Sequence, residues 1–219
     1  MNFTMADAFL FKNNRQAQIV LNDLHKAAKS DGIKVLKALG VGIFKKIEPH
    51  HVKSAYLPIS KEQGNFMYDV IVKNQYKHIV EFGTSFGIST IYLALAAQQT
   101  GGQVVTTEIV PEKCDQAIIN FEKAGLENYI ELRQGDALES LKKWNQSVDF
   151  LLLDGWKDLY LPVFRLLENY FHPNTTIFVD NTNFKGVKLF LKTIAQNPKY
   201  LISSIEVDKG HSAIITLKK

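Results

Sequence analysis

The residues from 148 to 181 constrain the fold more than any other part of the sequence. They contain two short apolar runs, at 150–153 and 176–179, and an aspartate follows each run, Asp154 or Asp180. Between the runs lies one segment of helix length, with apolar residues at helical spacing. Strand, helix and strand in this order predict a βαβ unit, whose strands are parallel and whose crossover is right-handed.

Asp154 and Asp180 are therefore expected at the same edge of a sheet. Neighbouring strands lie about 4.8 Å apart, and ligands of open α/β sheets bind outside the carboxyl ends of the strands. Asn181 follows Asp180 directly and adds an amide oxygen. Two carboxylates and an amide oxygen suit a hard divalent cation such as Mg²⁺ or Ca²⁺. Alternatively, each aspartate only caps the structure that follows its strand.

The length and composition favour one soluble domain over residues 1–219. The chain is long enough for a large core, with 46% hydrophobic residues. No apolar run reaches the ~20 residues that cross a bilayer, and the N-terminus does not resemble a secretory signal. The single cysteine, Cys114, excludes an internal disulfide and a thiolate metal cluster. We therefore expect a cytoplasmic protein with no membrane partner.

Positive charge is concentrated in the first quarter of the chain. Residues 1–53 contain nine Lys or Arg and four Asp or Glu, a net charge of +5. The remainder contains 17 and 18, a net charge of −1, so that the sum is the +4 of the whole chain. A basic segment of this kind is typical of proteins that bind a polyanion such as RNA. More often, however, such lysines lie on the solvent-exposed faces of amphipathic helices, and this is the favoured interpretation.

The first 55 residues are expected to form a helical layer in front of the core at 56–219. Apolar residues at helical spacing predict a helix over about 5–30. Ser30-Asp31-Gly32 predicts a break after it, and a second apolar segment follows at 33–44.

The segment from 78 to 102 is typical of a nucleotide-binding strand, glycine turn and helix. The strand at 78–83 enters a turn between Gly83 and Gly87, and Gly101-Gly102 ends the helix. In such a turn the backbone approaches a ligand closely, and the helix N-terminus offers free N–H groups. The glycine spacing G-x-x-x-G differs from the G-x-G-x-x-G of dinucleotide-binding enzymes, which argues against NAD.

Two further acidic residues are expected at the same edge of the sheet. Glu108 ends a predicted strand at 103–108, where an acid accepts hydrogen bonds from ribose hydroxyls. Asp136 follows a predicted strand at 129–133. It can accept a hydrogen bond from an exocyclic amine, or it can cap the helix that begins at Ala137. Both interpretations of Asp136 stay open.

Local signals place the elements at the two ends of the core. Ser60 and Gln63 have the spacing of a capping box, which predicts a helix from Gln63 to about residue 74. A helix is expected at about 185–194. Two strands follow, at about 201–207 and 212–217, and the turn between them predicts an antiparallel hairpin at the edge of the sheet.

These motifs together resemble the class I S-adenosylmethionine-dependent methyltransferases. The closer resemblance is to the cation-dependent O-methyltransferases, which include catechol and caffeoyl-CoA O-methyltransferases and bacterial relatives. It covers roughly residues 56–217 through the segments LPISKEQGNF, VEFGTSFGIST, TTEIVPE, GDALE, LLDGWKDLYLP and VDN. The specific signal is LLDGWKDLYLP, followed at strand spacing by VDN. The resemblance implies a Rossmann-like, doubly wound, mostly parallel seven-stranded sheet with an antiparallel C-terminal hairpin.

The resemblance also implies a role for individual residues. The residues expected to contact S-adenosylmethionine are Ile59, Ser60, Glu81, Gly83, Ser89, Glu108, Asp136, Ala137, Asp154 and Trp156. Among them, Ile59 and Ser60 would lie beside the methyl donor and Glu108 would hold the ribose. Asp154, Asp180 and Asn181 would bind a divalent cation, Mg²⁺ or alternatively Mn²⁺ or Ca²⁺. Lys157 would be the general base.

The implied reaction is O-methylation of a small hydroxylated acceptor, aromatic by analogy. A cation that touches a phenol oxygen lowers the pKa of the phenol from about 10. The same cation would lower the pKa of Lys157, because it disfavours the charged ammonium. Alternatively, Lys157 is a surface lysine in the first turn of a helix, although a cation is unfavourable there.

The acceptor itself is less constrained. Ser203 stands where catechol methylators carry an acid that binds the second hydroxyl, so catechol is not the expected substrate. One alternative acceptor is RNA, such as a hydroxylated uridine in tRNA. A different class of function is a non-catalytic protein that binds S-adenosylmethionine. Relatives are often dimers, which suggests a homodimer.

Overall fold

We describe residues 14–39, 59–207 and 211–218 from a computed structural model. Its centre is a seven-stranded sheet in the order β3-β2-β1-β4-β5-β7-β6. The strands are β1 His78–Phe82, β2 Gln103–Glu108, β3 Ile130–Gln134, β4 Val148–Leu153, β5 Phe171–Val179, β6 Tyr200–Ile205 and β7 Ser212–Leu217. Strands β1 to β5 pair in parallel, and β7 pairs antiparallel with both β5 and β6. The expected α/β fold, with its antiparallel C-terminal hairpin, is confirmed.

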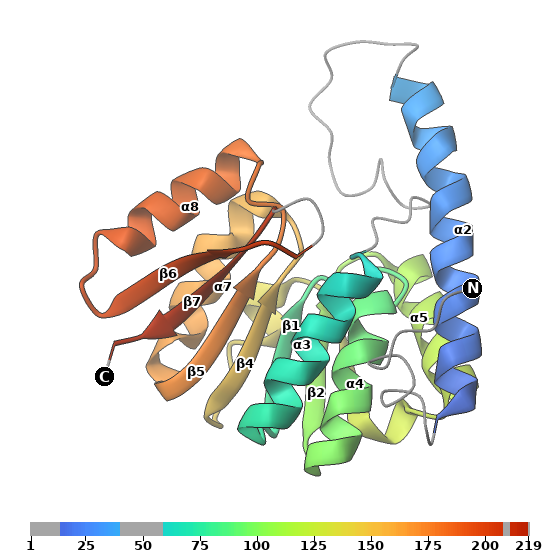
Figure 1. Cartoon of the computed structure of the whole chain (residues 1–219), viewed down its shortest axis with the longest axis horizontal. Coiled ribbons are helices and arrows are strands. Elements are labelled where there is room, and N and C mark those ends of the chain that lie inside the picture. The colour runs from blue at the N-terminus through green and yellow to red at the C-terminus, as the bar shows by residue number, and fades with distance from the viewer. Residues whose placement is uncertain (1–13, 40–58, 208–210, 219) are drawn as a thin grey trace.

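Helices cover both faces of the sheet (Figure 1). The α-helices are α2 Arg15–Leu39, α3 Lys61–Asn74, α4 Ile88–Thr100, α5 Pro111–Ala124, α6 Ala137–Ser140, α7 Tyr160–Leu167 and α8 Lys185–Ala195. Short 3-10 helices are η2 Glu127–Tyr129, η3 Lys157–Leu159 and η4 Glu168–Tyr170. Figure 1 shows α3 and α4 over the near face of the sheet, with the long helix α2 beside α4 and α5.

The hydrophobic core has two parts because successive side chains of a strand point to opposite faces. In β4, Phe150 and Leu152 pack with α2, α3, α4 and α5, whereas Leu151 and Leu153 pack with α6, α7 and α8. All four side chains are fully buried. A strand that is buried on both faces has a continuous apolar sequence, which is how residues 150–153 appear in the chain.

The helix boundaries follow the predicted local signals. At the start of α3, Gln63 N–H donates to Ser60 Oγ at 3.1 Å and Ser60 N–H donates to Gln63 Oε1 at 2.7 Å, so the capping box is confirmed. Gly101 caps the C-terminus of α4 and Gly125 caps that of α5, both with positive φ. Pro111 opens α5 as expected.

The predicted break at Ser30-Asp31-Gly32 is wrong, because α2 continues through it to Leu39. A glycine inside a helix costs only about 1 kcal/mol relative to alanine, and the Lys, Leu and Ala residues around this one are good helix formers. The rest of the predicted N-terminal layer, at 1–13 and 40–55, lies outside the described residues, as does the predicted turn at 208–210.

Strand β5 begins at Phe171, five residues before the predicted start at residue 176. Its pairing with β4 changes register between Val148 and Phe150, which accommodates the extra residues around Pro173. Proline lacks the N–H that a regular ladder needs, so a strand containing it does not show a simple alternating pattern.

The order of the strands creates one topological switch point. From β1 the chain proceeds outward through β2 and β3, and it then returns to build β4 and β5 on the other side of β1. Ligands of open α/β sheets bind at such a point, outside the carboxyl ends of the strands. The fold therefore directs attention to the residues that follow β1 and β4.

Candidate functional site

Gly83 and Gly155 bring the ends of β1 and β4 together. Gly83 has φ +105°, and a Cβ on it would lie 2.6 Å from the Cα of Gly155. The N–H of Asp154 donates to the carbonyl of Phe82 at 3.0 Å, which continues the β1–β4 pairing into the turn. A side chain at position 83 would push the two turns apart, so the glycine is required by this close approach.

The predicted metal ligands lie at the ends of neighbouring strands. Asp154 follows β4, Asp180 follows β5, and the N–H of Asp180 donates to the carbonyl of Leu153 at 3.1 Å. Asn181 has φ +61°, a left-handed conformation that asparagine adopts more easily than most residues. The structure thus brings the two carboxylates and the amide to one edge, as the sequence predicts.

The carboxylate of Asp180 is held by uncharged donors. It is 6% exposed, and its Oδ1 accepts hydrogen bonds from Gln63 Nε2 at 2.6 Å and from Ser212 Oγ at 3.2 Å. Its Oδ2 accepts a hydrogen bond from the side-chain amide of Asn181. Within the described part of the chain, no basic side chain forms an ion pair with Asp180.

The carboxyl group of Asp154 is buried close to other acidic side chains. Burial raises the pKa of its carboxyl to about 7, Lys157 opposes this shift, and Asp180 and Glu81 add to it. The side chain is 12% exposed, and its Oδ1 accepts a hydrogen bond from Lys157 Nζ at 3.2 Å. Crowded carboxylates in a buried place favour protonation or a bound cation.

Lys157 has two partners at this edge, and the side chain is 22% exposed. Besides Asp154, its Nζ donates to the hydroxyl of Tyr160 at 3.0 Å and lies 6.0 Å from the ring centre of Phe184. Burial raises the pKa of Tyr160 well above its ordinary value, so its hydroxyl stays neutral. That hydroxyl donates to the carbonyl of Asp180 at 3.4 Å. The lysine is therefore anchored among the predicted metal ligands.

Glu81 and Ser89 lie beneath the glycine turn. Glu81 is fully buried, and its Oε2 accepts hydrogen bonds from Thr90 at 2.5 Å and Thr106 at 2.6 Å. Burial raises the pKa of Glu81, and the hydroxyls of Ser89 and these two threonines oppose the shift. Its Oε1 has no hydrogen-bond partner among the described residues. A donor group of a ligand that binds over Gly83 would satisfy this oxygen.

Glu108 connects the glycine turn to the next helix. Its Oε2 accepts from the N–H of Ser85 at 2.8 Å, and its Oε1 accepts from the N–H of Val110 at 2.9 Å. Ser85 has φ +50°, one of three non-glycine residues with positive φ among those described. Such outliers often occur at ligand-binding sites. Each carboxylate oxygen keeps a lone pair for a ligand.

The remaining predicted cofactor residues surround these groups. Asp136 is exposed and caps α6 through a hydrogen bond from Leu138 N–H to its Oδ1 at 2.8 Å, so the capping interpretation is confirmed. Ala137 and Ile59 are buried, at 4% and 2% exposure. Trp156 is partly buried against the core on the side of α7. Their contact with a cofactor stays a prediction.

Two residues of this edge were not predicted as site residues. The local sequence predicts only a helix cap at Gln63 and a helical position at Tyr160. Both are buried, Gln63 at 6% and Tyr160 at 0% exposure. The sequence contains a signal for Tyr160, because a tyrosine three residues after a lysine in a helix can contact it. Nothing local indicates that Gln63 reaches a residue 117 positions away.

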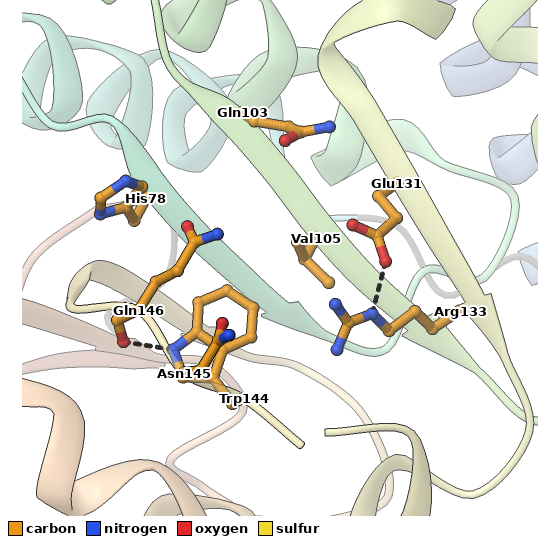
Figure 2. A pocket seen from close by; sticks show the side chains of 8 residues that line it. All are labelled: His78, Gln103, Val105, Glu131, Arg133, Trp144, Asn145 and Gln146. Carbon is orange, nitrogen blue, oxygen red and sulfur yellow. Dashed lines mark hydrogen bonds and ion pairs between the residues drawn. The ribbon is translucent and has the colours of Figure 1, made fainter. Parts of the chain in front are cut away.

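A separate small cavity of about 50 Å³ lies away from this edge (Figure 2). His78 and Gln103, the first residues of β1 and β2, line it, so it lies toward the opposite edge of the sheet. Two pairs form among its lining residues: Arg133 with Glu131 at 2.7 Å, and Trp144 Nε1 with the carbonyl of Gln146 at 2.6 Å. None of the predicted site residues lines it.

Two properties of the described residues concern membranes and metals. No helix among them combines the length and apolar character needed to span a bilayer. No group of three or more His, Cys, Asp and Glu side chains among them is arranged for a metal. The candidate site instead combines two carboxylates with one amide.

The comparisons with known proteins agree with this fold. A family model described as O-methyltransferase matches residues 16–212, which is most of the chain. The chain belongs to this O-methyltransferase family. Its Rossmann-like fold agrees with that of an O-methyltransferase from Bacillus cereus, which was solved in complex with S-adenosylhomocysteine (SAH). The TM-score between the two structures is 0.68. The two chains are 26% identical, and the match covers 90% of each.

Curated relatives of this chain carry the names expected from the motifs. A catechol O-methyltransferase of Niastella koreensis is 30% identical over 129 residues, covering 57% of this chain and 58% of the relative. Caffeoyl-CoA O-methyltransferase 2 of Petunia hybrida is 30% identical over 133 residues, covering 58% of this chain and 54% of the relative. The chain thus spans little more than half of these two relatives.

Proposed function

We propose that the protein is an S-adenosylmethionine-dependent O-methyltransferase that requires a divalent cation and methylates a hydroxyl of a small aromatic acceptor. The observation that carries the proposal is the meeting of Asp154, Lys157, Asp180 and Asn181 at the switch point of the sheet. A cofactor-binding protein without catalysis would have no use for this set.

The residues around the glycine turn fit the cofactor. Glu81 offers its unpaired Oε1 to the amino-acid part, and Glu108 offers carboxylate lone pairs to the ribose. Ser85 holds Glu108 in place beside the turn. Support also comes from the Bacillus cereus relative, whose structure contains SAH.

The donor set at the strand ends fits a hard cation. Asp180 is a buried carboxylate without a basic partner among the described residues, and Asp154 has a raised pKa because of burial and its acidic neighbours. A divalent cation bound by Asp154, Asp180 and Asn181 would relieve both conditions, since oxygen ligands suit Mg²⁺. Mn²⁺ and Ca²⁺ accept the same ligands.

The chain's own residues would then hold the acceptor and remove its proton. When bound, the cation lowers the pKa of the acceptor hydroxyl and the cofactor supplies a sulfonium methyl group. Lys157 lies beside Asp154, one of the proposed metal ligands, where its Nζ would accept the hydroxyl proton once neutral. Tyr160 keeps this nitrogen at the site. Ile59 and Ser60 would lie beside the methyl donor. Much of the rate gain would come from holding the donor and the acceptor hydroxyl in line.

Metal dependence is the direct test of this proposal. Excess chelator should abolish methyl transfer from labelled S-adenosylmethionine, and added Mg²⁺ or Mn²⁺ should restore it. Asp180→Ala should abolish metal-dependent transfer but keep most of the affinity for S-adenosylhomocysteine (SAH), because the cation would contact the acceptor rather than the nucleoside. Asp115→Ala, which changes an exposed aspartate of α5, is the control and should leave transfer unchanged.

Full methyl transfer in excess chelator would contradict the proposal. It would mean that Asp154, Asp180 and Asn181 only organise the turns that follow their strands.

RNA is a second candidate acceptor, because residues 1–53 carry a net charge of +5. Labelled methyl groups should appear in the small-molecule fraction of a cell extract if the first candidate is right. Labelling confined to the RNA fraction would favour the second.

A further inference from the structure

Gln63 connects the start of α3 to the predicted metal ligand Asp180. Its amide nitrogen donates to Asp180 Oδ1 at 2.6 Å and to Ser212 Oγ at 2.8 Å. Its amide oxygen accepts the N–H of Ser60 at 2.7 Å. A carboxylate only accepts hydrogen bonds and a backbone N–H only donates them, so these partners fix which way the amide points.

The surroundings leave the amide little freedom. Gln63, Asp180 and Ser212 are 6%, 6% and 1% exposed, so water has little access to replace these bonds. Helix α3 contributes Gln63, β7 contributes Ser212, and Asp180 follows β5. Three elements that are distant in sequence therefore meet at one side chain.

The choice of an uncharged side chain has a consequence for Asp180. A lysine or arginine in the position of Gln63 would neutralise the carboxylate, whereas an amide donates a hydrogen bond and leaves the negative charge in place. Oδ1 accepts hydrogen bonds from Gln63 and Ser212, and Oδ2 accepts one from the side-chain amide of Asn181, the third predicted ligand. Oδ2 has one donor where Oδ1 has two, so Oδ2 keeps a lone pair that can bind a cation.

We propose that Gln63 is a positioning residue of the metal centre. It fixes the carboxylate of Asp180 through Oδ1 and ties this orientation to Ser60, beside the expected place of the methyl donor. The inference rests on the proposed function, because it requires a cation between Asp154, Asp180 and Asn181. Hydrogen-bond partners of metal ligands matter in this way: their loss typically weakens metal affinity about 10- to 100-fold.

The test measures metal binding itself rather than activity. The affinity for Mn²⁺ is obtained by electron paramagnetic resonance of free Mn²⁺ for the wild type and for Gln63→Met, which keeps the side-chain length without a donor. We expect the dissociation constant to rise about 10- to 100-fold in this variant. Gln116→Met on α5, whose amide donates to Asn120 Oδ1 at 3.2 Å, is the matched control and should bind Mn²⁺ like the wild type.

A second measurement separates positioning from a general loss of structure. SAH affinity in metal-free buffer should be unchanged in Gln63→Met, since Glu81 and Glu108 remain in place. If this variant does not fold, Gln63→Asn replaces it: the amide is kept but is one methylene too short to reach Asp180, and the same loss of Mn²⁺ affinity is expected.

The outcomes distinguish the inference from the proposed function. Wild-type affinity for Mn²⁺ in a folded Gln63 variant overturns the inference alone. A parallel loss of Mn²⁺ and SAH affinity also overturns it, because the role of Gln63 would then be structural. A wild-type protein that binds no Mn²⁺ overturns the inference and the cation-dependent function together.

Discussion

At the scale of single residues, hydrogen bonds hold the side chains of the candidate site in place. Lys157 is held by one charged and one neutral partner, Asp154 and Tyr160, at 3.2 and 3.0 Å. The hydroxyl of Tyr160 holds the nitrogen without adding a second negative charge beside it. The two contacts together keep the nitrogen next to the predicted metal ligands.

We predict that Lys157→Ala binds Mn²⁺ and SAH but loses catalytic rate. The turnover number should fall about 10²- to 10⁴-fold, the usual contribution of a general base. Steady-state methyl transfer measures the change, and Lys192→Ala on the exposed face of α8 should keep the wild-type rate. Equal rates in the wild type and Lys157→Ala would assign the lysine to structure alone.

Glu108 provides a second prediction at this scale, because it would face the ribose. Glu108→Ala should weaken SAH binding by roughly 1.5–3 kcal/mol, the value of hydrogen bonds to a charged group. Calorimetry of SAH binding measures the change, and Glu127→Ala, at an exposed residue of η2, serves as the control. Unchanged affinity in Glu108→Ala would contradict the proposed orientation of the nucleoside.

At the scale of elements, the docking of α2 on α4 depends on a buried histidine. His25 is 8% exposed, and its Nε2 lies 3.3 Å from the hydroxyl of Tyr92. Burial lowers the pKa of His25 to about 4, with Lys61 and Lys29 adding to the shift and Glu62 opposing it. The folded protein therefore keeps this histidine neutral over a range in which the unfolded chain protonates it.

The sign of the pH dependence follows from this shift. The stabilisation is complete above the unfolded pKa of 6.5 and is lost as the pH falls toward the folded pKa of about 4. Between pH 7 and pH 5 the loss should be about 2 kcal/mol. Urea unfolding at both pH values measures it, and His25→Leu should lack this part of the loss. The same pH dependence in both proteins would show that His25 does not contribute.

At the scale of the whole molecule, one sheet joins two hydrophobic cores. The core on the side of α4 and the core on the side of α7 share strands β1, β4 and β5, whose side chains alternate between them. Neither core can lose its packing without disturbing these strands. We therefore propose that the chain unfolds as one cooperative domain, which unfolding experiments can test.

We predict that a cavity in either core destabilises the folded protein and shifts one and the same unfolding transition. Leu93 and Leu167 are fully buried in the two different cores, and replacing either by alanine should cost about 2–5 kcal/mol. Scanning calorimetry should show a single transition that shifts in both variants. Leu201, which is 53% exposed, is the control: Leu201→Ala should change stability by less than about 0.5 kcal/mol. Two separate transitions would contradict a single domain.

The sequence by itself determined the elements and their order, because those depend on local patterns. Buried parallel strands appear as continuous apolar runs, and glycine, proline and the Ser60–Gln63 pair mark helix ends through short-range geometry. The chain order of strands and helices then requires Asp154 and Asp180 to lie at one edge. The break predicted at Gly32 failed because a local signal of about 1 kcal/mol does not outweigh good helix formers around it.

Only the tertiary structure decided which distant side chains meet. Gln63 and Asp180 are 117 positions apart, and their contact depends on how α3 packs on the sheet beside β5 and β7. The same holds for His25 and Tyr92, 67 positions apart, whose burial sets the pKa of the histidine. Contacts of this kind come from packing, which brings together residues that no local pattern relates.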